Sequence, residues 1–274
     1  MDLKLSQVGS HIVVETADGR PVGRYAADDR HKPHLHPLYA PSGRMVSASI
    51  THDHRHHKGL MYALRLPELN FWEEVETLPG ERVGRQRPLE LSVQAASGAT
   101  VGFTQVLSWE AEDGTDQVFT EHRTISCTAR STGFVWTWHT RLEALRDLEL
   151  IMSQWSAVRA DGRRINYHGL GLRFPRSFGG MKSSSRVLLD GQPADYAEAM
   201  GAAAEAVTII GAYDGSWPPP ESGVRMRQFQ PGTPFVTRDP FAYLSMGPSN
   251  AGPRTVAAHD IIDETYEVEV FDLD

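Results

Sequence analysis

Apolar and polar side chains alternate from residue 134 to residue 142, and this period of two limits the fold more than any other feature. The two faces are Phe134, Trp136, Trp138, Thr140 and Leu142 against Val135, Thr137, His139 and Arg141. Alternation over such a length is typical of a half-buried β-strand. We expect Trp136 and Trp138 to lie in the core, with residues 148–158 as the partner strand.

Turn residues separate further strand-like segments along most of the chain. These segments are residues 3–16, 21–25, 90–94, 100–110, 117–129, 207–212 and 264–271. Asp18-Gly19 predicts a hairpin between the first two. Only residues 194–206 have good helix composition, and Gly201 weakens that helix.

The order of these segments predicts the fold class. No alternation of strands with helices and no repeat of 20–50 residues is visible. The pattern favours an all-β fold, an antiparallel β-sandwich or barrel. No Ser/Gly-rich linker interrupts the sequence, so we expect residues 1–274 to form a single β-sandwich domain.

Composition and charge exclude several classes of function. The 274 residues carry a formal charge of −8, which argues against nonspecific nucleic-acid binding. No run of 18 apolar residues or signal-peptide pattern is visible, so we expect no membrane partner and a cytoplasmic protein. The single cysteine, Cys127, fits a reducing compartment and is expected to be buried.

Histidines are concentrated in residues 31–60, which hold seven of the chain's 12. They are His31, His34, His36, His52, His54, His56 and His57. Histidine titrates near neutral pH and is a common metal ligand, whereas core packing does not explain such a cluster. We therefore expect the functional site here.

The segment Asp53-His54-Arg55-His56-His57 is the strongest candidate for catalysis. In an extended chain, His54 and His56 point to one side and His57 points to the other with Asp53. A carboxylate beside an imidazole orients it and raises its basicity, as proton transfer requires. The alternative is a solvated loop whose histidines cap backbone groups.

Other side chains of the predicted site come from different parts of the chain. His168 precedes Gly169, which allows a ligand to approach the backbone closely, and joins His54 and His57 as a predicted catalytic residue. The predicted substrate-binding residues are His36, Tyr39, Trp72, Glu73 and Arg173. For His36 and Arg173 a structural hydrogen bond or ion pair is an equal alternative, and Trp72 alone is more often a core residue.

A metal site is the rival explanation of the histidines. His54 and His56, with His36 or His168, offer three nitrogen ligands for a divalent metal such as zinc. Against this, the spacing differs from known zinc motifs, and Arg55 and Lys58 oppose a bound cation. The preferred interpretation therefore requires no cofactor.

Four motifs resemble those of one protein family. They are Pro33-His34-Leu35-His36-Pro37-Leu38-Tyr39, Asp53-His54-Arg55-His56-His57-Lys58-Gly59-Leu60, Asn70-Phe71-Trp72-Glu73 and Gly169-Leu170-Gly171-Leu172-Arg173-Phe174. In this order they resemble the DUF6807 family, also labelled the PmoA family. The resemblance implies a β-supersandwich like that of galactose mutarotases, with carbohydrates as the usual substrates. Met61 departs from the aromatic residue common at that position.

Three hypotheses of function follow. The first is an enzyme that acts on a small carbohydrate by histidine-mediated proton transfer, of the epimerase, mutarotase or lyase type. The second is a metal-dependent hydrolase or lyase acting on an oxidised sugar at the same histidines. The third is a carbohydrate-binding module without catalysis. The sequence leaves open the sugar, the acid and base roles, and whether the chain forms a homo-oligomer.

Overall fold

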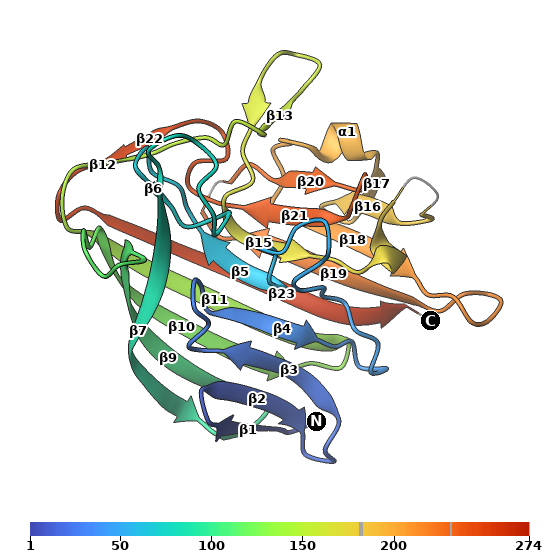
Figure 1. Ribbon diagram of the computed structural model, residues 1–274. Coiled ribbons are helices and arrows are strands. Elements are labelled where there is room, and N and C mark those ends of the chain that lie inside the picture. Colours follow the sequence, from blue (N-terminus) through green and yellow to red (C-terminus); the bar gives the residue numbers. More distant parts are fainter. Residues whose placement is uncertain (181–182, 231, 274) are drawn as a thin grey trace.

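The chain forms two large antiparallel sheets packed face to face, seen in a computed structural model that describes residues 1–180, 183–230 and 232–273. In Figure 1 the N-terminal strands lie over the long strands of the second sheet. The prediction of an all-β antiparallel sandwich is confirmed.

The first sheet has, within the described residues, nine strands in the order β20-β21-β15-β5-β4-β3-β2-β1-β8. Their bounds are Phe235–Thr237 (β20), Tyr243–Met246 (β21), Gly169–Arg173 (β15), Leu60–Ala63 (β5), His34–Leu38 (β4), Pro21–Ala26 (β3), His11–Thr16 (β2), Leu3–Val8 (β1) and Ser97–Gly98 (β8). The Asp18-Gly19 turn joins β2 to β3 as predicted. The expected strand 3–16 is two strands, because the chain reverses at Gly9, where φ is +61°.

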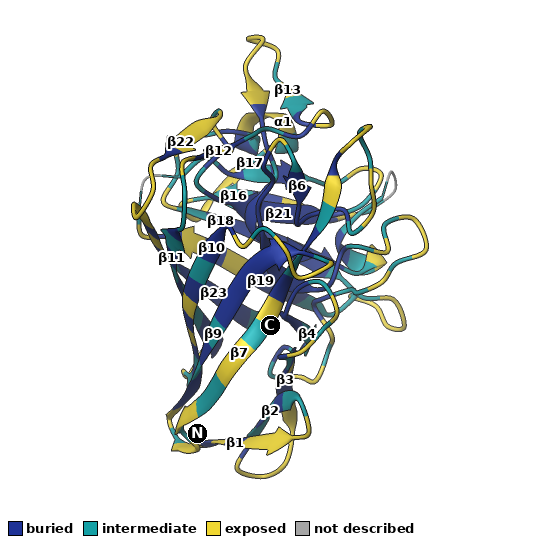
Figure 2. Cartoon of the chain, turned by 60° about the vertical axis from the view of Figure 1, so that its left-hand side comes forward, coloured by how far each residue is buried: buried dark blue, intermediate teal, exposed yellow. Residues whose placement is uncertain are grey.

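The second sheet has ten strands in the same part of the chain, in the order β17-β16-β18-β19-β23-β11-β10-β9-β7-β6. Their bounds are Gln192–Ala194 (β17), Arg186–Leu189 (β16), Ala206–Ala212 (β18), Glu221–Gln228 (β19), Ile261–Leu273 (β23), Gly133–Ala144 (β11), Phe119–Ala129 (β10), Thr100–Ala111 (β9), Arg82–Ala95 (β7) and Leu69–Asn70 (β6). Only β6 and β7 pair in parallel among the strands described. Figure 2 shows β9 and β19 buried over most of their length, whereas β7, near the end of the sheet, is mostly exposed or half-buried.

Smaller elements complete the described structure. They are the pair β12 (Leu148–Leu150) and β22 (Arg254–Val256), the pair β13 (Ala157–Val158) and β14 (Arg164–Ile165), the 3-10 helix η1 (Arg176–Phe178) and the helix α1 (Tyr196–Ala199). The predicted helix 194–206 is wrong beyond this single turn. Asp195 and Glu198 form a capping box at its start, but Gly201 has a φ of +68° that ends helical geometry.

The core lies between the two sheets and takes one face of each. Trp136 and Trp138 of β11 lie in it, as the alternation predicts. The predicted partner of this strand is wrong: β11 pairs with β10 and β23, and residues 148–150 pair with β22. A strand's own pattern fixes its buried face and does not specify which neighbour it pairs with.

Candidate functional site

The candidate site lies on the face of the nine-stranded sheet that points away from this core. Strand β5 alternates, so that Leu60 and Tyr62 enter the core between the sheets and Met61 and Ala63 point to the opposite face. There a second apolar cluster forms. It consists of Met61, Ala63, Trp72 and Tyr243, with Tyr167, Phe235 and Phe241 packed against it.

Two glycines of β15 make room for this cluster. Leu170 and Leu172 enter the core, so Gly169 and Gly171 lie on the outer face. A Cβ at Gly171 would collide with the hydroxyl group of Tyr243 on the neighbouring strand. The Gly-Leu-Gly-Leu pattern therefore gives one buried face and one flat face across which an aromatic ring can lie.

A cavity of about 470 Å³ opens above this cluster. Its lining consists of Asp53, His54, His56, His57, Trp72, Glu73, Val75, Thr77, Trp155, Tyr167, Phe235, Pro240, Phe241 and Tyr243. The size and the mixture of aromatic walls with a few polar groups match those of small-molecule sites.

Arg173, at the end of β15, holds the histidine loop in place. Its Nη2 donates to both carboxylate oxygens of Asp53, at 3.0 and 3.2 Å. Its Nη1 donates to Nδ1 of His57 at 3.2 Å, and its guanidinium lies 3.8 Å from the ring centre of Phe241. Arginine has only donors, so Nδ1 of His57 must be the acceptor, and the neutral ring carries its proton on Nε2.

The histidines of the cavity are held in the neutral form. Burial, together with the neighbouring His56 and Arg173, keeps the pKa of His57 well below its ordinary value. Burial and the charge of Lys32 lower the pKa of His56 to about 3, and burial also lowers that of His54. At neutral pH these rings are hydrogen-bonding groups without charge.

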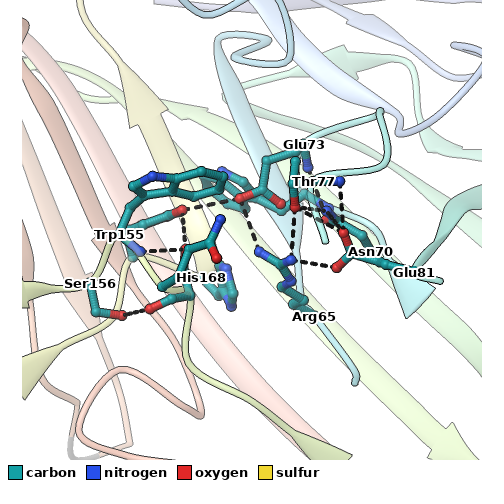
Figure 3. Close-up of polar contacts among 12 residues, drawn as sticks. Arg65, Asn70, Glu73, Thr77, Glu81, Trp155, Ser156 and His168 are labelled. Atoms are coloured by element: carbon teal, nitrogen blue, oxygen red, sulfur yellow. Dashed lines mark hydrogen bonds and ion pairs between the residues drawn. The ribbon is translucent and has the colours of Figure 1, made fainter. Parts of the chain in front are cut away.

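Glu73 is the second carboxylate of the lining, besides Asp53. Oδ1 of Asn70 accepts hydrogen bonds from the backbone N–H groups of Trp72 (2.9 Å) and Glu73 (3.0 Å), which fixes the turn after β6. Oε1 of Glu73 lies 3.4 Å from Nη1 of Arg65 and accepts a hydrogen bond from the Tyr167 hydroxyl at 3.2 Å. Figure 3 shows this carboxylate beside the group of Arg65, Asn70, Thr77 and Glu81.

One oxygen of this carboxylate is unused. Within the described residues Oε2 of Glu73 is buried and has no hydrogen-bond partner. Burial raises the pKa of Glu73 above its ordinary value, and the charge of Arg65 offsets this only in part. A cavity carboxyl with a raised pKa is a candidate for proton exchange with a ligand.

A buried ion cluster supports the loop from beneath. Lys32 is fully buried, pairs with Glu74 at 3.1 Å and donates to the backbone oxygen of Trp72. Lys58 pairs with Asp29 at 2.5 Å and with Glu74 at 3.0 Å. These contacts tie the histidine loop to the Trp72-Glu73 turn.

Five of the predicted site residues line the cavity together: His54, His56, His57, Trp72 and Glu73. His168 and Arg173 lie behind the lining. The ring of His168 is 5.4 Å from that of Trp72, and its Nδ1 accepts from Asn166 at 2.9 Å.

His36 and Tyr39 are not part of this lining. Nδ1 of His36 is hydrogen-bonded to Ser47 Oγ at 2.9 Å, and Tyr39 bridges to Met45 through its backbone. Among the residues described, no group of three or more His, Cys, Asp or Glu side chains is arranged to hold a metal ion. His36 is thus not grouped with His54 and His56 as a ligand set.

Several lining residues are not predicted by the sequence. Tyr167 stands beside His168, a predicted site residue, but its link to Glu73 spans 94 positions of sequence. Trp155, Phe235, Phe241 and Tyr243 lie in segments without any motif, and nothing in their local sequence distinguishes them from core aromatics.

Asp263 and Glu264 of β23 are two acidic residues with contacts away from the cavity. Asp263 pairs with His139 at 2.8 Å. Glu264 accepts hydrogen bonds from the hydroxyl groups of Tyr62 (3.0 Å) and Tyr266 (2.5 Å). None of these residues lines the cavity described here.

The fold and this cavity define an antiparallel β-sandwich with an aromatic, histidine-bearing pocket on its outer face. The chain belongs to the DUF6807 family: the model described as "Family of unknown function (DUF6807)" matches residues 13–274. The family resemblance read from the motifs is thereby confirmed, and this description assigns the family no activity. No curated protein matches the chain.

Solved structures with a similar backbone fold include three proteins that are named as sugar epimerases or mutarotase-like proteins. Galactose 1-epimerase from Lactobacillus acidophilus NCFM has 6% identity and a TM-score of 0.44, with 100% of this chain and 99% of that chain covered. A putative aldose 1-epimerase from Escherichia coli K12 has 9% identity and a TM-score of 0.37, with both chains fully covered. A galactose mutarotase-like protein from Lactobacillus casei ATCC 334 has 11% identity and a TM-score of 0.39, covering 98% and 99%.

Among the described residues no helix is both long and apolar enough to cross a membrane.

Proposed function

We propose that the protein is an enzyme that acts on a carbohydrate by proton transfer in this cavity, of the epimerase, mutarotase or lyase type. The observation that carries the proposal is Glu73, a buried carboxyl with a raised pKa and a free Oε2, in a cavity that also holds neutral histidines.

The two kinds of group suggest separate roles. Glu73 exchanges the proton, because burial raises its pKa and its Oε2 has no partner among the described residues. His57 acts as the hydrogen-bond donor through Nε2–H, because Arg173 occupies its Nδ1. Glu73 removes a proton from a sugar hydroxyl or C–H group while His57 stabilises the negative charge that develops on a sugar oxygen. His168 supports the floor behind Trp72 and has a positioning role.

The walls favour a sugar over other small molecules. A pyranose ring has apolar C–H faces and polar edges, and aromatic side chains offer an apolar face beside polar groups. Trp72, Tyr167, Phe241 and Tyr243 supply such faces next to Glu73 and His57. The lining therefore matches both parts of a carbohydrate.

A panel of aldoses, keto-sugars and methyl glycosides in D₂O tests the proposal. NMR measures the exchange of anomers and the uptake of deuterium at carbon, and ultraviolet absorbance detects the unsaturated product of a lyase. On a substrate that turns over, Glu73→Gln is expected to lower kcat by about 10²–10⁴-fold. Glu76→Gln is the matched control, because Glu76 is exposed on the same loop and lies outside the lining.

Full turnover by the Glu73→Gln variant, or absence of turnover across the panel by the wild-type protein, contradicts the proposal. The metal-dependent alternative has its own test, the metal content of tag-free protein and its activity after chelation. A stoichiometric metal whose removal abolishes turnover would replace the proton-transfer account.

A further inference from the structure

The mouth of the cavity differs from its interior. Glu73, His57, Trp72 and Tyr243 are buried at the base, whereas Trp155 and Val75 at the rim are 56% and 58% exposed. Pro240 adds a third exposed apolar side chain to the same rim. Exposed apolar side chains gathered at the entrance of a cavity mark a surface that a ligand covers.

The backbone that carries Trp155 is held firmly although its indole is exposed. Ser153 Oγ accepts from the backbone N–H of Trp155 at 3.2 Å, and Ser156 Oγ donates to the Ser153 carbonyl at 2.7 Å. The backbone N–H of Ser153 donates to Asn166 Oδ1 at 3.1 Å, and Arg164 donates to the Ser153 carbonyl at 2.9 Å. An aromatic ring on a fixed backbone loses little entropy when a ligand binds to it.

A chain of hydrogen bonds joins this rim to the acid at the base. Trp155 donates to Ser153, Ser153 is hydrogen-bonded to the Tyr167 hydroxyl at 2.5 Å, and Tyr167 donates to Glu73. Figure 3 shows Trp155, Ser156 and Glu73 in one polar group. The rim and the base are therefore parts of one site, at a fixed separation.

The charges of the lining indicate which sugars fit. Within the described residues the lining contains the carboxyl groups of Asp53 and Glu73 and neutral histidines, but no Lys or Arg. Arg173 lies close by, but Asp53 occupies its Nη2 and His57 its Nη1, and its Nε, which has no partner among the described residues, is buried away from the surface. A uronate or a sugar phosphate would bring a further negative charge to this lining without a cation to receive it.

We propose that the site takes a neutral glycoside, in preference to a free monosaccharide or an acidic sugar. The reacting ring lies between Glu73 and His57, and a second ring, a sugar or an aromatic aglycone, stacks on Trp155 beside Val75. This inference rests on the proposed function for the identity of the reacting ring.

Binding to paired probes tests the outer position of the site. Glucose, galactose and xylose are compared with cellobiose, lactose, xylobiose and the 4-nitrophenyl β-glycosides, with glucuronate and galacturonate as acidic probes. Calorimetry and saturation-transfer NMR measure affinity for the wild-type protein and for Trp155→Ala, Trp155→Phe and Trp217→Ala. Trp217 is the control, because it is 91% exposed and outside the lining.

The wild-type protein is expected to bind the two-ring member of at least one pair about tenfold more tightly than its monosaccharide, as one aromatic stacking contact provides. Trp155→Ala removes this preference and leaves monosaccharide affinity within about twofold, whereas Trp155→Phe retains most of it and Trp217→Ala all of it. Equal weakening of both members by Trp155→Ala, no preference in the wild-type protein, or tightest binding of an acidic probe overturns the inference.

The two proposals fail separately. A lost two-ring preference with normal Glu73-dependent turnover overturns only the outer position. A Trp155-dependent preference without turnover by the wild-type protein overturns only the proposed catalysis. If no probe binds, both are wrong.

Discussion

Two buried arginine–carboxylate networks in this protein consist of similar side chains. They differ in how many of their buried polar atoms have a hydrogen-bond partner among the described residues. In the sandwich core, Arg123 donates to both oxygens of Glu121 at 2.8 Å, to Tyr25 at 2.9 Å and to Gln86 at 2.9 Å. Glu121 also accepts from Trp109 Nε1 at 2.7 Å. Arg123 further stacks over the ring of Trp138 at 4.6 Å.

Beneath the cavity, Arg65 pairs with Glu81 at 2.5 Å and with Glu73 at the longer distance of 3.4 Å. Nε of Arg65 and Oε2 of Glu73 are buried without a hydrogen-bond partner among the described residues.

The difference separates a structural network from a functional one. Buried polar groups in folded proteins are almost always hydrogen-bonded, because an unpaired one costs about 1–3 kcal/mol. The Arg123 network meets this rule within the chain. The Arg65–Glu73 pair does not, and Glu73 borders a cavity that a ligand can enter. If the first network serves stability and the second serves ligands, substitutions in the two should have different effects.

The largest effect on stability is expected from Arg123→Met. The substitution leaves the buried carboxylate of Glu121 without the guanidinium of Arg123. The unfolding free energy is therefore expected to fall by about 3–5 kcal/mol. Urea denaturation measures the loss, and sugar affinity of the remaining folded protein should equal that of the wild-type protein. A loss below about 1 kcal/mol would contradict the structural role of this network.

The second effect is a dependence of stability on pH that arises from His168. Burial lowers the pKa of His168 to about 3, whereas the unfolded chain protonates near pH 6.5. Below pH 6.5 the unfolded state binds the extra proton, so stability falls as pH falls, down to about pH 3. At pH 5 this one group costs about 2 kcal/mol.

Urea denaturation at pH 7.5 and pH 5 tests this prediction with His168→Gln. The variant should lose about 2 kcal/mol less between the two pH values than the wild-type protein. His122→Gln is the control, because His122 is an exposed histidine of β10. An unchanged difference in His168→Gln would show that other groups govern the acid sensitivity.

The sequence predicted the parts of this molecule that depend on local pattern. The alternation of β11 gave its buried face, and the motif at residues 53–57 located three lining histidines. The partners of β11 and the contacts of Glu73 could not be predicted, because they join residues far apart in the chain. Tyr167 reaches Glu73 across 94 positions, and Arg173 reaches His57 across 116.

The partner of Arg173 could likewise not be predicted from the sequence. An arginine is expected to bind a carboxylate, and the carboxylate that Arg173 binds is that of Asp53 in the same protein. A structural ion pair of Arg173, with no partner specified, is the equal alternative that the sequence leaves open. Only the geometry indicates that Arg173 sets the tautomer of His57.

A smaller effect, on turnover, is expected from Arg173→Lys. A lysine keeps the charge but cannot bind both Asp53 oxygens and donate to His57 at once. Because the tautomer of His57 is then no longer fixed, the kcat of the variant is expected to fall about tenfold with little change in KM. Arg176→Lys, on the adjacent 3-10 helix and outside the lining, is the control. A change in KM alone would indicate that Arg173 contacts the substrate.

The smallest effect on stability is expected from Glu73→Gln, which should not show the large loss expected of Arg123→Met. Glu73→Gln replaces a buried carboxyl, which is only partly paired, by an amide of the same shape. The unfolding free energy is therefore expected to stay within about 1 kcal/mol of the wild-type value or to rise at neutral pH. The raised pKa of Glu73 determines the direction in which stability changes with pH. The folded state holds the proton more firmly than the unfolded chain, so stability falls as pH rises through the folded pKa, and the amide removes this loss. Urea denaturation at pH 5 and pH 7.5 measures it. A large loss of stability in Glu73→Gln would show that the two networks are alike and that the free Oε2 of Glu73 is not reserved for a ligand.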